Sequence, residues 1–260
     1  MQGIFGSVWH PDMPEAYHDK IIRGDLLRLL LTLPDESVDA VVTDPPYSSG
    51  GMFRGDRTGH NTRDKYQANG TEKQYPEFFG DTRDQRAYHY WLSLWLAECW
   101  RIARPGAPIC IFTDWRQLPT TTDAMQAGGW VWRGIAVWDK TEAARPQKGR
   151  FRAQCEYIPW GSKGEWWSDE GTCLSGVLRR AVNSSKKQHV TSKPVEVMRW
   201  LLSACPPGGV VLDPCAGSGT TCQVAIEMGM HFVGFEIAPE YSDVADMRMS
   251  IRQYGLQLAV

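Results

Sequence analysis

The sequence lacks any long hydrophobic run. No stretch approaches the ~20 consecutive apolar residues of a membrane-spanning helix. No basic region leads into an apolar stretch near the N-terminus, so we expect no signal peptide. The six histidines are scattered without ligand spacing, and we expect no metal. Seven cysteines without a C-x-x-C pair favour a reduced, cytoplasmic protein over a disulfide framework.

A large charge of one sign is also missing. The formal net charge is −2 at pH 7, so the chain is not a general polycation. The cations are instead concentrated, because residues 141–193 hold ten Lys and Arg against five acidic residues. Such a local patch can bind phosphate groups. A solvated basic face of no particular function would have the same composition.

The 260 residues suffice for a single large domain, residues 1–260, with a substantial core. Strand-like and helix-like segments alternate, which predicts an α/β fold with a mostly parallel sheet and helices on both faces. We expect seven strands, near residues 20–24, 38–43, 108–113, 131–138, 154–160, 209–213 and 231–235. We expect helices near residues 25–32, 85–103, 115–127, 193–204, 219–228 and 239–253. The aromatic residues of the second helix are interpreted as core packing.

Two segments break this alternation. Residues 48–84 are polar and glycine-bearing, which is typical of a lid or a binding loop in a compact domain. Residues 161–188 are basic, contain Trp166 and Trp167, and show no clean periodicity. We therefore expect both segments to lie outside the regular sheet and helices.

Four residues directly after the apolar strand 38–43 suggest a chemistry: Asp44, Pro45, Pro46 and Tyr47. The prolines fix φ and remove N–H donors, so neither a helix nor a central strand can continue. The Asp44 carboxylate and the Pro45 carbonyl can then accept both N–H groups of a planar amine, while Tyr47 stacks on the ring that carries it. The alternative is a strand that merely ends in a proline turn.

A second motif spans residues 210–221, where an apolar strand ends in an acid and a glycine-bearing turn leads into a helix. Gly217 and Gly219 let the backbone adopt φ > 0 or approach a ligand closely. Thr220 or Thr221 can cap the helix that follows. A tight strand–helix connection without a ligand would use similar residues.

Glu236 ends another short strand, about 20 residues beyond the glycine turn. A carboxylate at this spacing binds ribose hydroxyls in nucleotide-binding folds. Together with Asp213 at the end of the preceding strand, it predicts an adenosine-containing cofactor.

With both motifs in view, the chain resembles the amino-methyltransferases of DNA, which transfer a methyl group from S-adenosylmethionine to adenine N6 or cytosine N4. Residues 44–47 resemble the catalytic motif of that family, and residues 213–219 resemble its cofactor loop. Because the catalytic motif comes first, the order resembles that of the permuted β group. The resemblance implies a Rossmann-like class I methyltransferase fold with a circularly permuted motif order.

The resemblance also implies roles for individual residues. Asp213 would lie near the methionine amine, Glu236 would hold the ribose, and Asp25 would meet the adenine, although Asp25 could instead cap a helix and Asp213 could merely end a strand. Residues 189–194 resemble a box near the methionine carboxylate, with Val190 and Ser192 in place of its first proline and its glutamine. The implied cofactor-binding residues are Asp25, Asp213, Pro214, Ala216, Gly217, Gly219, Glu236, Thr191 and Lys193.

The implied substrate is double-stranded DNA with a flipped base, read by residues 161–188 as target-recognition insert and by the loop 48–84. Asp as first motif residue is mostly found in adenine-N6 enzymes of the family, which favours adenine over cytosine. Many members of the family that it resembles dimerise, so a homodimer is one candidate assembly. A cognate restriction endonuclease is one candidate partner, beside an enzyme that acts alone or belongs to a phage. Cytosine-N4 methylation, another amine acceptor such as RNA or a protein glutamine, and a DNA-binding homologue without turnover stay open as alternatives.

Overall fold

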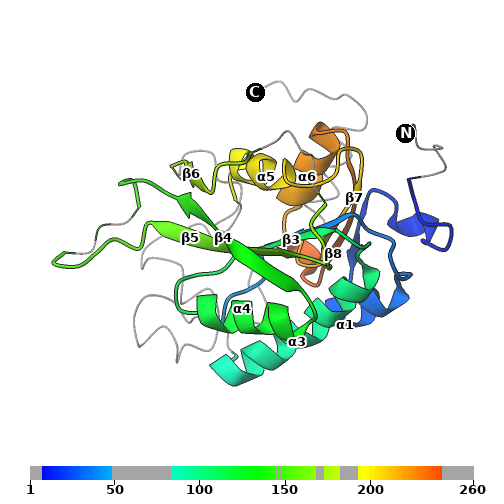
Figure 1. Cartoon of the computed structure of the whole chain (residues 1–260), viewed down its shortest axis with the longest axis horizontal. Helices are drawn as coiled ribbons and strands as arrows, with labels where there is room; N and C mark the ends of the chain where they lie inside the picture. The colour runs from blue at the N-terminus through cyan, green and yellow to red at the C-terminus, as the bar shows by residue number, and fades with distance from the viewer. Residues whose placement is uncertain are drawn as a thin grey trace.

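The computed structural model describes residues 8–48, 83–144, 146, 148–167, 173–181 and 193–241. These ranges contain an eight-stranded sheet in the order β1-β8-β7-β2-β3-β5-β4-β6 (Figure 1). The β3–β5 and β4–β5 pairs are antiparallel, and every other neighbouring pair is parallel. The strands are β1 (Lys20–Arg23), β2 (Ala40–Thr43), β3 (Pro108–Ile111), β4 (Val131–Asp139), β5 (Cys155–Ser162), β6 (Val177–Arg179), β7 (Val210–Asp213) and β8 (His231–Glu236).

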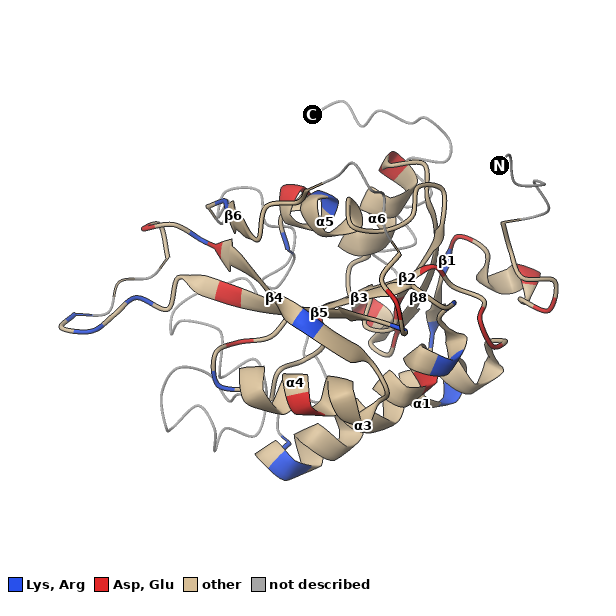
Figure 2. Ribbon diagram, in the orientation of Figure 1, with Lys and Arg blue, Asp and Glu red and all other residues tan. Residues whose placement is uncertain are grey.

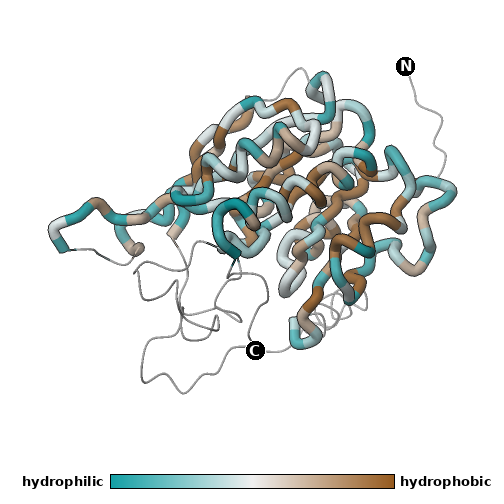
Figure 3. Tube along the Cα trace, turned by 90° about the horizontal axis from the view of Figure 1, so that it is seen from below, coloured by the Kyte–Doolittle hydropathy of each residue, from teal (hydrophilic) through white to brown (hydrophobic). Residues whose placement is uncertain are grey.

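Helices cover both faces of the sheet, as predicted. The helical elements are η1 (Glu15–Tyr17), α1 (Leu26–Leu29), η2 (Leu30–Thr32), α3 (Gln85–Ile102), α4 (Leu118–Ala127), α5 (Val195–Leu202) and α6 (Thr220–Glu227). Figure 1 shows α1, α3 and α4 on one side and α5 and α6 on the other. Alternate residues of a strand face opposite sides, and Val41 accordingly belongs to the core cluster that contains α3, whereas Ala40 and Val42 belong to the one that contains α5 and α6. Figure 3 shows the hydrophobic positions gathered in this interior.

The sheet has a topological switch point between β2 and β7. After β2 the chain continues to β3 on one side, and after β7 it continues to β8 on the other. The two strands are parallel neighbours, with Val41 opposite Leu212, so their carboxyl ends lie at the same edge. Open α/β sheets bind their ligands at such a point, beyond the carboxyl ends of the strands.

The predicted strand count was wrong, because the described ranges contain eight strands rather than seven. The additional strand is β6, inside the segment 161–188 that has no clean periodicity. It is three residues long and pairs in parallel with the edge strand β4, where Val177 lies opposite Val137. A strand this short is defined by its partner and not by a pattern of its own.

The helix predictions agree with the structure in type and differ at several ends. The segment 25–32 is a single α-turn followed by the 3-10 turn η2, and α4 begins only at Leu118. Neither threonine caps α6, because the cap position is Gly219 in the left-handed conformation. Residues 239–241 are helical, and the rest of the predicted helix 239–253 lies outside the described residues, as does most of the loop 48–84. None of the described helices is long and apolar enough to cross a membrane.

The aromatic helix α3 largely packs inward, as expected. Tyr88 and Trp95 are fully buried, whereas Tyr90 is 67% exposed. Trp100 is partly exposed, and the ammonium of Lys163 lies 4.4 Å from its ring centroid. Most of the aromatic content therefore stabilises the core between α3 and the sheet.

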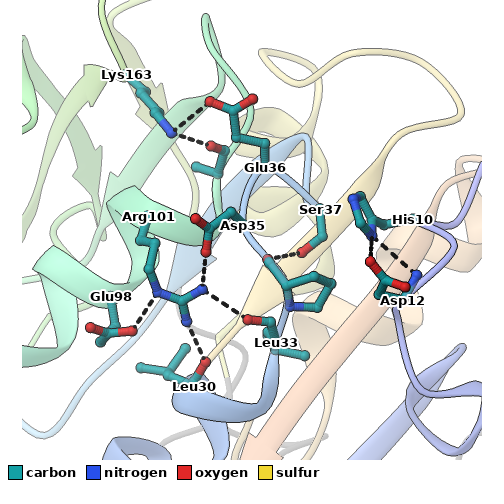
Figure 4. Close-up of polar contacts among 12 residues, drawn as sticks. His10, Asp12, Leu30, Leu33, Asp35, Glu36, Ser37, Glu98, Arg101 and Lys163 are labelled. Carbon is teal, nitrogen blue, oxygen red and sulfur yellow. Dashed lines mark hydrogen bonds and ion pairs between the residues drawn. The ribbon is translucent and has the colours of Figure 1, made fainter.

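Arg101, near the end of α3, fastens the segment after η2 to this helix (Figure 4). Its guanidinium donates to the carbonyls of Leu30 and Leu33 and to the carboxylates of Asp35 and Glu98. The Leu33 carbonyl follows the last helical turn, so Arg101 supplies a donor that the helix there lacks. The Leu30 carbonyl accepts from Arg101 in addition to Leu33 N. Together these hydrogen bonds fix the backbone between η2 and β2 against α3.

We expect Arg101→Ala to lower the free energy of unfolding by about 2 kcal/mol, because several hydrogen bonds worth about 1 kcal/mol each are lost. For a chain of this size the melting temperature then falls by roughly 4–8 °C. Thermal unfolding followed by circular dichroism measures the shift. Asp35→Ala removes only the most exposed partner, and a shift as large as that of Arg101→Ala would contradict the importance of the two carbonyls.

Candidate active site

The two sequence motifs meet at the switch point. Asp44 directly follows β2, and Asp213 is the last residue of its neighbour β7. The hydroxyl of Thr43 donates to Asp213 Oδ1 at 2.8 Å through buried atoms. Parallel pairing of β2 and β7 therefore brings together two acidic residues that are 169 positions apart in the sequence.

Asp44 is held by two side chains. Lys193 Nζ lies 2.6 Å from Asp44 Oδ2, and the hydroxyl of Tyr47 donates to Asp44 Oδ1 at 2.7 Å. Lys193 comes from the segment just before α5, and its ammonium also lies 5.5 Å from the ring centroid of Tyr47 and 5.0 Å from that of Phe112. A carboxylate offers about four lone-pair sites, so both oxygens of Asp44 can still accept a further donor.

Glu156, on β5, completes this cluster and was not among the predicted site residues. Its Oε2 accepts from the Tyr47 hydroxyl at 3.2 Å and lies 3.2 Å from Lys193 Nζ. Its Oε1 lies 3.3 Å from Lys140 Nζ. A carboxylate at the start of an otherwise apolar strand is the signal in the sequence that could have identified it. The antiparallel β5 carries it toward the carboxyl edge of the parallel strands.

The four charges of this cluster balance one another. Burial raises the pKa of Asp44 above its ordinary value, and the Lys193 ammonium opposes that rise. Burial would also raise the pKa of Glu156, but Lys193 and Lys140 bring it below its ordinary value. Asp44 and Glu156 together raise the pKa of Lys193 despite its burial. Two carboxylates thus face two ammonium groups, and neutrality makes the buried cluster tolerable.

Pro45 and Tyr47 occupy the positions that the motif assigns to them, next to Asp44. Pro45 is buried, and within the described ranges its carbonyl accepts no hydrogen bond. The carbonyl oxygen of Pro45 can therefore accept a donor from a ligand. Tyr47 is partly buried, and burial together with Asp44 and Glu156 raises the pKa of its hydroxyl well above the ordinary value. Tyr47 is therefore a neutral hydrogen-bond donor.

The glycine turn after β7 has the backbone geometry that its residues predict. Gly217 has φ +53° and Gly219 has φ +78°, a region that disfavours side chains. A Cβ added to Gly217 would meet nothing within 4 Å. The turn is tied to β8, because Ala216 N donates to the carbonyl of Phe235 at 2.8 Å. An open side and a fixed backbone at a strand end fit a cofactor that passes close to the main chain.

Glu236, at the end of β8, and Asp25, just after β1, lie at the same edge of the sheet. Glu236 Oε2 accepts from Gly217 N at 2.8 Å, and its Oε1 accepts from Ala238 N at 2.7 Å. Asp25 Oδ1 accepts from Leu27 N at 2.9 Å and so caps α1, which is the alternative role that the sequence offered for Asp25. Each carboxylate keeps lone pairs for a ligand. Burial raises the pKa of Glu236.

Asp213, at the start of the glycine loop, is 2% exposed. Burial raises its pKa to about 6, while hydrogen bonds from Thr221, Thr43 and the Cys215 backbone lower it in part. Burial, with Asp213 and Glu236 nearby, raises the pKa of the Cys215 thiol well above its ordinary value. Cys215 is therefore a protonated thiol at neutral pH and not a nucleophile.

Not every predicted site residue can be placed. Pro214 and Ala216 lie in the glycine turn with Gly217, whereas Thr191 lies outside the described residues. Lys193, expected on the cofactor side, contacts the carboxylate of the catalytic motif. The part of the chain that the structure describes contains no group of three potential metal ligands.

Comparison with known proteins gives consistent matches. The N6/N4 DNA methylase family model matches residues 38–247. The chain is 30% identical over 239 residues to YubD, a protein of Escherichia coli (strain K12) named as a methylase. That alignment covers 92% of this chain and 93% of YubD. It is 28% identical over 257 residues to the Type II methyltransferase M.HinfI of Haemophilus influenzae, covering 88% of this chain and 67% of that protein.

Solved structures share the fold over most of the chain. The M1.HpyAVI–SAM complex has a TM-score of 0.63 at 22% identity, covering 88% of this chain and 98% of that one. The PvuII DNA methyltransferase, described as cytosine-N4-specific, has a TM-score of 0.66 at 18% identity, covering 88% of this chain and 85% of that one. The fold is that of the class I methyltransferases, as predicted. The assignment to the permuted β group stays a prediction.

Proposed function

Because the chain belongs to the family of N6/N4 DNA methylases, we propose that it methylates the exocyclic N6 amine of an adenine flipped out of double-stranded DNA. S-adenosylmethionine is the cofactor of this family, and it supplies an electrophilic methyl group on a sulfonium. The observation that carries the proposal is the meeting of Asp44 and Asp213 at the switch point, joined through Thr43. In this proposal the residues after β2 bind the base, and the residues after β7 bind the cofactor.

The chemistry follows from the weakness of the nucleophile. The lone pair of an exocyclic amine is delocalised into the ring, and hydrogen bonds from both N–H groups to Asp44 and the Pro45 carbonyl localise it on nitrogen. Asp44 also stabilises the positive charge that develops on that nitrogen. After transfer the nitrogen is more acidic, and Asp44, whose pKa burial raises, accepts the departing proton. Stacking on Tyr47 offsets part of the cost of flipping the base.

Lys193 and Glu156 set the charge of Asp44. The ammonium of Lys193 holds Asp44 ionised before the base arrives, since its charge opposes the effect of burial. Glu156 holds Lys193 and the Tyr47 hydroxyl from the opposite side. These contacts orient the acceptor without contributing a base, so Lys193 and Glu156 are positioning residues.

On the cofactor side, the open glycine turn fits S-adenosylmethionine. Gly217 and Gly219 would allow its close approach, together with Pro214 and Ala216. Asp213 would pair with its methionine amine, Glu236 with its ribose hydroxyls and Asp25 with its adenine, as the resemblance implies. The same resemblance assigns Thr191 and Lys193 to the methionine carboxylate. The contact of Lys193 with Asp44 supports a place between the two ligands.

We expect the affinity for S-adenosylmethionine to fall as the pH drops below about 6, the pKa of Asp213. Protonation removes the negative charge that would balance the ammonium of the methionine moiety, which itself stays charged below about pH 7. The dissociation constant is then expected to rise by up to about tenfold per pH unit. Titration calorimetry between pH 5 and 7 measures it. Asp213→Asn should bind more weakly with a flat profile, and an unchanged slope in this variant would assign the titration to another group.

Adenine is favoured over cytosine because the motif begins with Asp44, as in most adenine-specific relatives. The direct test is incubation with unmethylated duplex DNA and S-adenosylmethionine, followed by digestion to nucleosides and mass spectrometry. N6-methyladenine is the expected product. N4-methylcytosine would leave the mechanism unchanged and contradict the choice of adenine as the target base. If protein that binds the cofactor gave no methylated nucleoside, another amine acceptor would be indicated.

The partners predicted from the sequence belong to this proposal. A cognate restriction endonuclease draws support from the Type II methyltransferase among the relatives. The homodimer, the target-recognition role of 161–188 and the role of the loop 48–84 stay predictions. The excess of Lys and Arg in residues 141–193 supports a DNA substrate over a protein substrate.

A further inference from the structure

The connection between β4 and β5 starts beside the catalytic cluster and leaves the body of the protein. Its base is the pair of Asp139 with Cys155, and Lys140 N still donates to the carbonyl of Gln154 at 2.8 Å. Lys140 follows Asp139 on the first arm and Glu156 follows Cys155 on the second, and both side chains belong to the cluster around Asp44. Figures 1 and 3 both show the connection projecting far beyond the sheet. The base of the connection therefore lies next to the catalytic cluster, and its end reaches outward from that place.

Contacts within the protein hold the base of this hairpin. Arg152 donates to the carbonyls of Glu142 and Ala144. Glu142 in turn accepts from Arg179 of β6 at 2.6 Å, and Gln154 donates to Asp139 at 2.9 Å. The strand β6 thus supports the hairpin from one side, and these contacts hold the end of the hairpin away from the sheet.

Unlike the base, the tip of the hairpin is exposed. Phe151 is 99% exposed, and the side chains of Lys148 and Arg150 are exposed without a hydrogen bond or ion pair to the described part of the chain. Figure 2 shows the colour of Lys and Arg at this far end. A fully exposed phenylalanine that directly follows two exposed cations gains no packing from the fold itself. Large exposed apolar side chains in a charged setting mark interaction sites.

Two cations beside a bare aromatic ring match the chemistry of a nucleic acid. Lys and Arg bind phosphates, and an aromatic ring stacks on any base or enters a base step as a wedge. Phe151 precedes Cys155, the first residue of β5, by four residues. At about 3.3 Å per residue, an extended arm places Phe151 up to ~13 Å from the start of β5. This reach is comparable with the ~12 Å width of the major groove.

We propose that the tip of the β4–β5 hairpin contacts the DNA next to the target nucleotide, with Lys148 and Arg150 on phosphates and Phe151 against a base exposed by the flip. The inference rests on the proposed function, which supplies the DNA and the flipped base. It assigns to the hairpin a role that the catalytic motif and the cofactor loop do not perform. A flipped base leaves a gap in the stack, and an aromatic side chain at the correct reach stabilises that gap.

The test uses the full chain, a duplex that it binds, and variants of the tip. We expect Phe151→Ala to lower kcat/KM for DNA by roughly 10- to 100-fold, the effect of losing one base–aromatic stack. Phe151→Trp is expected to retain most activity. Lys148→Ala with Arg150→Ala is expected to weaken DNA binding about tenfold or more and to reduce the slope of log Kd against log salt by about 1.8. Cofactor affinity and melting temperature are expected to stay at wild-type values.

Matched controls come from the other parts of the surface. Lys20 is an exposed cation at the amino end of β1, which lies at the sheet edge opposite the site, and Leu31 is an apolar side chain that is 65% exposed. Lys20→Ala and Leu31→Ala are expected to leave DNA binding and its salt slope unchanged.

Wild-type DNA affinity and salt slope in the tip variants would overturn the inference and leave the proposed function intact. DNA affinity weakened only in the tip variants would support it even if the wild type transferred no methyl group to DNA, the outcome that overturns the proposed function. Tip variants that lose binding to an acidic protein and keep their DNA affinity would also overturn it.

Discussion

Asp44→Ala is expected to abolish methyl transfer while S-adenosylmethionine still binds. The carboxylate is the only charged acceptor that the catalytic motif offers to the amine, and it stabilises charge that exists only in the transition state. Losing such a group costs about 10²–10³-fold in kcat, and losing its positioning role as well should bring the total to about 10³-fold or more. The cofactor loop follows a different strand, so the dissociation constant of the cofactor is expected to change by no more than about twofold.

Two variants sharpen this experiment. Asp44→Asn keeps one acceptor oxygen but loses the charge, and we expect activity between those of Asp44→Ala and the wild type. Asp12→Ala is the matched control, because Asp12 is 82% exposed and pairs only weakly with His10. Methylation is measured by transfer of a labelled methyl group, and cofactor binding by calorimetry. Turnover by Asp44→Ala within tenfold of the wild type would place the amine acceptor elsewhere.

Lys193→Met is expected to give the second large effect, a loss that depends on pH. Without the ammonium, burial and Glu156 raise the pKa of Asp44 with no positive charge beside it to oppose them. The amine needs an ionised acceptor, so the acid limb of kcat/KM moves to higher pH. At pH 7 we expect activity about 10²-fold below that of the wild type, with partial recovery as the pH approaches 9.

The double variant Lys193→Met with Glu156→Gln separates charge from structure. It removes one positive and one negative charge from the cluster and thereby relieves the repulsion between Glu156 and Asp44. We expect its acid limb to return toward the wild-type position and its melting temperature to exceed that of Lys193→Met. A profile of Lys193→Met that is only scaled down, with an unshifted acid limb, would show that Lys193 does not set the ionisation of Asp44. Circular dichroism and thermal unfolding establish that each variant is folded.

Residues close to one another in sequence were predicted well. Both motifs are strand–turn units, whose geometry is set by prolines after β2 and by glycines after β7, so local chemistry was enough to place Asp44 and Asp213 at strand ends. The alternation of strand-like and helix-like segments likewise predicted a sheet covered on both faces. These predictions depended on steric limits that act over a few residues.

Residues that depend on distant partners were not predictable in the same way. Glu156 lies 112 positions after Asp44, and only the antiparallel pairing of β5 with β3 brings it near Tyr47. Lys193 was placed by resemblance on the cofactor side, and its ion pair with Asp44 depends on where α5 packs. The strand β6 exists because the edge of β4 is available, and the cap of α6 is set by the left-handed Gly219 rather than by a threonine hydroxyl.

The buried hydroxyl of Thr43 has a thermodynamic consequence for how the two ligands meet. It belongs to the strand that presents Asp44, yet it donates to the acid that ends the neighbouring strand. A ligand that reorients Asp213 therefore also acts on the backbone just before Asp44, and the reverse holds equally. Linkage requires the two effects to be equal in free energy. We therefore expect methyl donor and base to act as heterotropic effectors of each other, coupled through the hydroxyl of Thr43.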